Sequence, residues 1–273
     1  MSQDSVKIHR GLVGVYFDRT KTTYINGKEG ILEYCGYNIH DLAENSTFEE
    51  TAYLLLNGKL PNQTELDQFN TDLINSRSIP PKIIDIIRSI KDAHPMDVLR
   101  TSVSALSTFD EEAADKSYEA TMRKGIRLTS QVPTIVMAHN AIRNDKEPIQ
   151  PSKSLSHAAN FLYMLDGQTP SESSAKLMDK DFIVHADHGS NASAFAARVC
   201  AGTQADLHSA ITTGISVLSG PSHGGAAENV MKMVKDVESP DEAKDYVTNL
   251  LKNKKRVMGF GHRVYKSQDP RAG

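Results

Sequence analysis

The sequence predicts a mainly α-helical protein with a small antiparallel β element at its N-terminus. Short runs of β-branched and aromatic residues occur in the first forty residues (GVYF, TTYI and ILEY). From Ser46 onward, apolar residues recur at helical spacing between capping and breaking residues. Strand patterns do not alternate with these helical segments, which argues against a parallel α/β sheet.

The first elements follow from local signals. TTYI and ILEY flank Asn26-Gly27, the strongest short signal for a β-hairpin. Ser46 and Glu49 have the spacing of a capping box, which predicts a helix through FEETAYLLLN. We expect Gly58 to end that helix, because glycine readily adopts the left-handed conformation of a helix C-terminus.

The rest of the chain is predicted to be a series of helices. After Pro80-Pro81, the residues Ile83, Ile84, Ile87 and Ile90 fall on one helical face. HPMD is expected to open a further helix, and Pro133 to kink or break a long one. The predicted helices cover 65–74, KIIDIIRSIKDA, VLRTSVSALSTF, 111–143, 154–165, ASAFAARVCAG, LHSAITTGISVLSG, 224–236 and 241–253.

Composition limits the class of function. The 273 residues carry a net charge of −3, so no basic field is available for nucleic acid. The apolar runs are too short to span a bilayer, and the N-terminus lacks the apolar core of a signal peptide. Cys35 and Cys200 fit a reducing cytoplasm, although two cysteines could in principle pair. We therefore expect a cytoplasmic protein without nucleic-acid or membrane partners.

A first candidate catalytic residue is His223, in the stretch SGPSHGGAAENV. Ser222 is a good helix N-cap, which would place His223 at the positive end of the helix dipole. That end keeps imidazole neutral, so the ring could donate a hydrogen bond to a developing enolate. The alternative is a surface-loop histidine at a helix start.

A second candidate is His262, in GFGHRVYKSQDPRAG. Glycines before it permit tight bends, and Arg263, Lys266 and Arg271 follow. Cations beside a loop histidine indicate an anionic substrate, because arginine binds carboxylate or phosphate bidentately. The alternative is a solvated basic segment.

The segment HADHGSN contains His185 and His188, three residues apart. With Asp187 they could form a metal site, but we favour a hydrogen-bonding role in a polar pocket. The sequence has no nucleophile elbow, P-loop or Rossmann fingerprint. The pattern indicates acid–base chemistry by imidazoles on an anionic substrate.

Together these segments resemble citrate synthase of the shorter bacterial and archaeal form. The likeness also covers GLVGVYFDRT and INGKEGILEYCGYNIHDLAENSTFEETAYLLLNGKLP, and so almost the whole chain. It implies a homodimeric, two-domain, multi-helical fold, with dimers that could assemble further. Residues 1–222 would be the large domain and 223–273 the first part of the small domain. Both would be incomplete, with the closing C-terminal helices absent.

The resemblance implies an acyltransferase of the tricarboxylic acid cycle. It would condense acetyl-CoA with oxaloacetate and hydrolyse citryl-CoA, without a metal or redox cofactor. His223 matches the histidine that stabilises the enolate, and His262 the histidine that acts as acid on the oxaloacetate carbonyl. His188 and Arg271 match residues that bind oxaloacetate.

The resemblance also implies CoA contacts. Lys266 lies where the family carries a basic residue near the CoA phosphates. Val257, Gly259 and Gly261 match the loop around the CoA adenine. The family's catalytic aspartate would lie beyond Gly273, so we name no base and expect a chain ending there to turn over little.

Two other functions remain open on the sequence. A 2-methylcitrate synthase shares these motifs but uses propionyl-CoA, and a methylene is worth only about 1–3 kcal/mol of discrimination. A catalytically inactive assembly or regulatory subunit would keep the same helical scaffold.

Overall fold

The computed structural model describes Gly14 and residues 18–221, 223–262 and 264–272. Its first element is a three-stranded antiparallel sheet in the order β1-β2-β3. The strands are β1 (Thr23–Asn26), β2 (Ile31–Tyr34) and β3 (Tyr37–Asn38). β3 was not predicted, and most of the expected run GVYF lies outside the described residues.

The hairpin predicted at Asn26-Gly27 is confirmed. Asn26 pairs with Ile31, so that β1 and β2 are joined by residues 27–30, called here the β1–β2 turn. The Asn26 side-chain oxygen accepts hydrogen bonds from the backbone N–H groups of Lys28 and Glu29, at 3.1 and 3.3 Å. This Asx-type bonding stabilises the turn locally.

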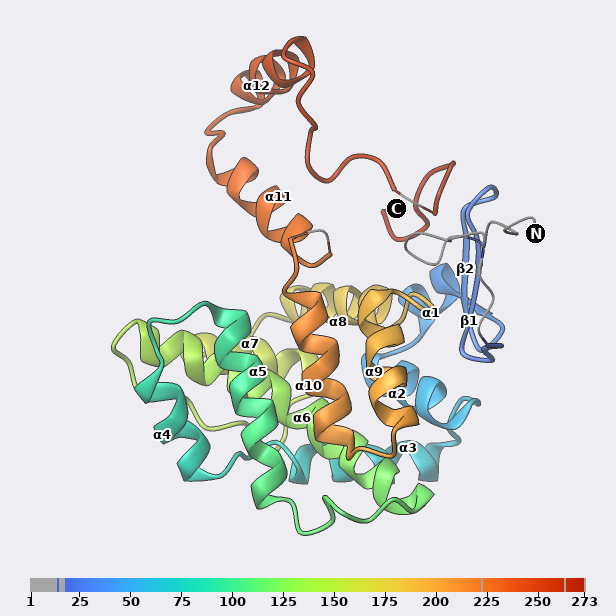
Figure 1. Ribbon diagram of the computed structural model, residues 1–273, viewed down its shortest axis with the longest axis vertical. Helices are drawn as coiled ribbons and strands as arrows, with labels where there is room; N and C mark the ends of the chain where they lie inside the picture. The colour runs from blue at the N-terminus through green and yellow to red at the C-terminus, as the bar shows by residue number, and fades with distance from the viewer. Residues whose placement is uncertain (1–13, 15–17, 222, 263, 273) are drawn as a thin grey trace, which may run out of the picture.

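The described part of the chain is otherwise mainly helical, as predicted (Figure 1). The helices are α1 (Ile39–Asn45), α2 (Phe48–Asn57), α3 (Gln63–Asn75), α4 (Pro81–Ser89), α5 (Pro95–Leu106), α6 (Tyr118–Arg143), α7 (His157–Asp166), α8 (Glu172–His185), α9 (Ala192–Gly202), α10 (Leu207–Leu218), α11 (Gly225–Lys235) and α12 (Pro240–Lys252). A 3₁₀ turn covers Ser107–Phe109. Of these, α1 and α8 had no counterpart in the sequence prediction.

The capping box of α2 lies one residue later than predicted. Thr47, not Ser46, is the N-cap, and Glu50 reaches back to the Thr47 backbone N–H at 3.1 Å. Glu49 instead accepts a hydrogen bond from the backbone N–H of His157 at 2.7 Å, which caps the start of α7. Gly58 ends α2 at φ +74°, as expected.

The long helix α6 differs from its prediction at its start and at Pro133. It begins at Tyr118 rather than residue 111, with Ser117 as N-cap. The carbonyl groups of Glu112, Ala113 and Asp115 instead accept hydrogen bonds from the buried ammonium of Lys124. They therefore do not form the backbone hydrogen bonds of an α-helix. The helix also continues through Pro133, where a break was one expectation.

The largest core cluster lies between α4, α5, α6 and α10. Ile83 and Ile87 on α4 are fully buried, and Ile84 and Ile90 pack against the same cluster. The predicted isoleucine face is therefore confirmed for Ile83, Ile84 and Ile87, whereas Ile90 is the C-cap that follows the end of α4 at Ser89. A second cluster joins β2, α1, α2 and α8 around the fully buried Leu32 and Tyr34, and it anchors the hairpin to the helical body.

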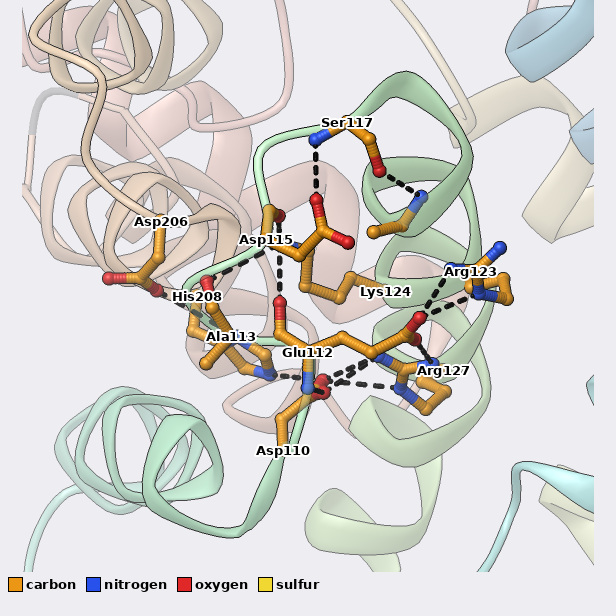
Figure 2. A network of polar contacts seen from close by, with 11 residues as sticks. Asp110, Glu112, Ala113, Asp115, Ser117, Arg123, Lys124, Arg127, Asp206 and His208 are labelled. Carbon is orange, nitrogen blue, oxygen red and sulfur yellow. Dashed lines mark hydrogen bonds and ion pairs between the residues drawn. The ribbon is translucent and has the colours of Figure 1, made fainter.

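A network of charges fixes the loop between α5 and α6 (Figure 2). Arg127 binds Asp110 at 2.7 Å and Glu112 at 2.8 Å, and Arg123 also binds Glu112. His208 of α10 is 2% exposed, and its Nε2 lies 3.5 Å from Asp110. Burial lowers the pKa of His208 despite the neighbouring carboxylates. The network thus ties this loop to both α6 and α10.

A buried carboxylate on α8 predicts an unusual pH dependence. Asp179 accepts hydrogen bonds from the backbone N–H of Phe48 at 3.2 and 3.3 Å, at the N-terminus of α2. Burial raises the pKa of Asp179 to about 6, with Glu49 and Glu50 adding to the rise. The folded state therefore favours the protonated form, and its contribution to the free energy of unfolding falls as pH rises from about 4 to 6.

We expect Asp179→Asn to increase the free energy of unfolding at pH 7. The amide keeps an oxygen for Phe48 and removes the unfavourable charge. One pKa unit is about 1.4 kcal/mol, but solvent screens this partly exposed group, so we expect a gain of about 1 kcal/mol. Urea unfolding at pH 7 and pH 4 checks this. The gain should disappear at pH 4, and an equal or lower stability of the variant at pH 7 would contradict it.

The last two helices project from the packed body, and α11 touches it where the Glu228 carboxylate lies 3.5 Å from Nε2 of His94 at the start of α5. Figure 1 shows α11 and α12 projecting from the end of α10, after which the chain returns toward β1 and β2. Neither helix contains a buried residue. The domain boundary between 222 and 223 stays a prediction. Among the described residues, no helix combines the length and apolar character needed to cross a membrane.

Candidate active site

His188 lies on the short connection between α8 and α9, which the hairpin holds through Asp187. The Tyr34 hydroxyl donates to the Asp187 carbonyl at 2.8 Å and accepts from its N–H at 3.2 Å. Thr23 of β1 donates to the Asp187 carboxylate. Burial raises the pKa of Tyr34 to about 12, so the hydroxyl stays a neutral donor at physiological pH.

The backbone around His262 orients its ring. Its Nδ1 accepts hydrogen bonds from the N–H groups of Val264 at 3.1 Å and Tyr265 at 3.2 Å. An atom that accepts two hydrogen bonds carries no proton, so in the neutral ring the proton lies on Nε2. His262 is exposed, and its Nε2–H is therefore a donor available to a ligand.

His188, His262 and Tyr265 form one ring cluster. The ring centroids of His188 and His262 are 5.4 Å apart, and those of His262 and Tyr265 are 4.8 Å apart. The Tyr265 hydroxyl lies 3.0 Å from Nε2 of His188. Burial, with the charges of Arg271 and His262, lowers the pKa of His188 to about 4. His188 is therefore neutral near pH 7.

Arg271 belongs to the same cluster. Its guanidinium lies 6.0 Å from the centre of the Tyr265 ring and makes two hydrogen bonds to Asp269, at 2.9 and 2.7 Å. Burial alone would raise the pKa of Asp269, but the hydrogen bonds from Arg271 bring it below its usual value. The cation that was predicted to bind a substrate carboxylate thus already holds an internal carboxylate.

His223 has a different neighbourhood. It lies before α11, whose N-cap is Gly224, and its Nε2 is 2.8 Å from the Ser193 hydroxyl in the first turn of α9. Among the described residues, ring contacts join His188 to His262 but not to His223. The N-cap is therefore not Ser222, as predicted, and His223 precedes the helix; Ser222 itself lies outside the described residues. The structure brings together two of the three histidines and places the third beside α9, the helix that follows His188.

Three of the predicted CoA-binding residues, Val257, Gly259 and Gly261, lie between α12 and His262 in the chain, and the fourth, Lys266, follows Tyr265. Gly259 and Gly261 have φ of +85° and +82°, and Val257 is half-buried. Gly259 lies against Val230 of α11. The backbone N–H of Lys266 donates to the Gly27 carbonyl at 2.7 Å, and its side chain is exposed. Their role in CoA binding stays a prediction.

The alternative metal site at His185 and His188 has little geometric support. Nδ1 of His185 lies 2.8 Å from the Asp181 carbonyl, one turn back on α8, whereas Nε2 of His188 faces Tyr265. Within the described ranges, no group of three or more His, Cys, Asp or Glu residues is placed to hold a metal ion. The two rings are engaged with different parts of the protein.

Comparison with known proteins identifies the family. A model of the family described as "Citrate synthase, C-terminal domain" matches residues 11–273. The chain belongs to the citrate synthase family. Citrate synthase of Haloferax volcanii is 44% identical over 98% of this chain and 72% of that protein. The 2-methylcitrate synthase of Shewanella oneidensis is 38% identical over 96% of this chain and 69% of that protein. Family membership makes the chain an enzyme of the acyltransferase type.

Solved citrate synthase structures share the fold. The enzyme from Pyrobaculum aerophilum superposes with a TM-score of 0.90 at 38% identity, covering 97% of this chain and 68% of the other. A ternary complex of the Thermoplasma acidophilum citrate synthase with carboxymethyl coenzyme A and oxaloacetate gives 0.89 at 30% identity, covering 97% and 70%. The mainly α-helical citrate synthase fold is therefore confirmed.

Sequence reasoning missed three residues that the geometry places in the site of this citrate synthase family member. Ser193 contacts His223, Tyr265 contacts both other histidines, and Tyr34 supports the His188 connection. Tyr265 had a usable signal, because an aromatic residue inside the polar run HRVYKSQDPRA is a candidate for burial, and it is only 4% exposed. Ser193 and Tyr34 act through contacts between distant segments and had no local signal.

Proposed function

We propose that this chain is a citrate synthase, which condenses acetyl-CoA with oxaloacetate and hydrolyses the citryl-CoA formed. The observation that carries the proposal is the cluster of His188, His262 and Arg271 beside Tyr265. It combines a neutral imidazole, a ring N–H donor and a guanidinium, which can bind one carboxylate and polarise the carbonyl of a substrate such as oxaloacetate. The relatives named citrate synthase, at 41–44% identity, support it.

The proposed roles follow from the donors. His262 Nε2–H hydrogen-bonds the ketone oxygen of oxaloacetate and gives it a proton as the new carbon–carbon bond forms. Arg271 holds a substrate carboxylate bidentately, and His188 donates a hydrogen bond to the same substrate. His223 hydrogen-bonds the thioester oxygen and stabilises the enolate after a base removes a proton from the acetyl methyl group. Water then cleaves the thioester and releases CoA.

The contact between the Ser193 hydroxyl and Nε2 of His223 supports the role of His223, because it orients the ring. If the serine hydroxyl donates to Nε2, the proton of the neutral ring lies on Nδ1, which can then donate to a ligand. We propose Val257, Gly259, Gly261 and Lys266 as the CoA contacts. Left-handed glycines open a loop for close approach, and a lysine attracts phosphate.

We propose that no resident metal or redox cofactor takes part, because the imidazoles supply hydrogen-bond donors and acid catalysis and the thioester carbonyl makes the acetyl methyl group more acidic. We also propose a cytoplasmic homodimer. A second copy would cover the half-exposed apolar side chains of Met96, Leu99 and Val136, which line a cavity of about 250 Å³ between α5 and α6. The same activity would place the enzyme at the entry of the tricarboxylic acid cycle.

Acyl preference tests the proposal against 2-methylcitrate synthase. With oxaloacetate present, we expect kcat/KM for acetyl-CoA to exceed that for propionyl-CoA about 10-fold or more, since one methylene is worth roughly 1–3 kcal/mol. The rate at which the free CoA thiol is released from each thioester gives both kcat/KM values. A preference for propionyl-CoA would identify a 2-methylcitrate synthase. In a chain that includes the family's catalytic aspartate, oxaloacetate binding without turnover of either thioester would favour the inactive assembly subunit.

A further inference from the structure

We propose that Gly27, in the β1–β2 turn, is a positioning residue that sets the alignment of His262 and Arg271 with His188. The inference rests on the proposed function, because it concerns how the oxaloacetate side of that site is held. The hairpin contacts both halves of the ring cluster, which come from segments more than seventy residues apart in the chain.

The first half of the contact lies at the β1–β2 turn. The Gly27 carbonyl accepts a hydrogen bond from the Lys266 N–H at 2.7 Å. A Cβ on residue 27 would lie 2.2 Å from the carbonyl oxygen of Val264 and 2.8 Å from its carbon. Since both obstructing atoms are backbone, they cannot rotate away as a flexible side chain could. Only glycine permits residues 264–266 to lie this close.

Gly30 repeats the same kind of approach at the other end of the turn. A Cβ there would lie 2.8 Å from the Gln268 carbonyl oxygen and 2.9 Å from the Ser267 hydroxyl. The turn is therefore in contact with residues 264–268, the stretch that joins His262 to Arg271. Two close approaches fix the position of this stretch more firmly than one.

The second half of the contact lies on the strands. Tyr34 of β2 binds the backbone of Asp187, and Thr23 of β1 binds its carboxylate. Tyr34 and Leu32 are fully buried in the core cluster with Ile183 of α8. One hairpin, anchored in the core, thus holds the residue next to His188 and also the stretch next to His262.

Displacing the turn contact should change the surroundings of His188. The groups that face this ring are Tyr265, which lies within residues 264–268, and His262, Asp269 and Arg271, which lie next to these residues in the chain. Burial lowers the pKa of His188 to about 4, with the charges of Arg271 and His262 adding to the fall and the charge of Asp269 opposing it. Moving the stretch outward would expose the ring, and its pKa would rise toward the ordinary value of 6.5.

The test compares Gly27→Ala with a matched control, Gly125→Ala. Gly125 lies inside α6, and a Cβ there meets nothing within 4 Å outside its own helix turn. We expect Gly27→Ala to weaken oxaloacetate binding about 10-fold or more in calorimetry, because small misplacements of catalytic groups have effects of this size. The control should bind as the wild type does. NMR titration of the ligand-free proteins should show a raised pKa of His188 only in Gly27→Ala.

A second variant keeps the proposal testable if Gly27→Ala fails to fold. Tyr34→Phe keeps the buried ring and removes only the hydroxyl that holds Asp187, and we expect it too to raise the pKa of His188. Unchanged titration of His188 in every folded variant would overturn the proposal. Failure of the wild type to bind oxaloacetate would instead count against the proposed function, because the titration in ligand-free protein still reports on positioning.

Discussion

Replacing His262 with Asn should lower kcat about 10²–10³-fold, the usual loss when one preorganised donor to a developing oxyanion is removed. The Asn side-chain oxygen can occupy the place of Nδ1 and accept from the Val264 and Tyr265 N–H groups, so the local backbone should keep its shape. The variant then lacks only the Nε2–H donor. Thiol release from acetyl-CoA at saturating oxaloacetate measures kcat.

His185→Asn is the control for this experiment. His185 is exposed, contacts Asp181 on its own helix, and is three residues from His188. We expect its kcat to stay within about two-fold of the wild type, in line with the small effects of surface changes away from a site. A His262→Asn enzyme with near wild-type kcat would remove His262 from the proposed mechanism.

Replacing Arg127 with Met should decrease the free energy of unfolding by about 3 kcal/mol, because it leaves a buried carboxylate without its partner. Asp110 has a side chain only 8% exposed and is held mainly by Arg127, with His208 3.5 Å away (Figure 2). Met fills most of the volume of the arginine stem, so the loss comes from the charge and not from a cavity. Urea unfolding at pH 7 gives the value.

A double-mutant cycle with Asp110→Asn separates the pair from the packing. Once the carboxylate is neutral, Arg127→Met should decrease the free energy of unfolding much less. Arg88→Met is the surface comparison, because its pair with Glu147 is 43% and 80% exposed and should contribute only about 0–1 kcal/mol. Equal losses for Arg127→Met and Arg88→Met would show that burial of Asp110 does not matter.

Local signals predicted much of the fold. Asn26-Gly27, Gly58 and the proline at the start of α4 act on their own neighbours, and each begins or ends an element as expected. The prediction failed where distant residues decide. Helix-forming residues 111–117 are not helical because Lys124 and Arg127 bind that loop. The α2 capping box shifted to Thr47 because Glu49 is used at the start of α7.

The candidate site was predictable only in part for the same reason. Glycine-flanked histidines predicted one anionic site containing His188, His223 and His262, and the resemblance added Arg271. The structure brings His188, His262 and Arg271 together and places His223 beside Ser193 of α9. Their supports could not be predicted. Tyr34 and Gly27 lie far from them in sequence, and an Asn-Gly pair in a hairpin gives no sign that its backbone touches the stretch between His262 and Arg271.

The ion pair between Arg271 and Asp269 has a consequence for ligand entry. Because the guanidinium already has a tethered carboxylate two residues away, an incoming acid must compete with it at high effective concentration. Binding of a simple monocarboxylate forms one ion pair with Arg271 but breaks the ion pair between Arg271 and Asp269, so the net gain in binding free energy is small. A ligand that also offers a second anionic group and a ketone to other donors gains more than it displaces. We therefore expect a monocarboxylate such as acetate to bind at Arg271 more weakly than a ligand with two carboxylates and a ketone.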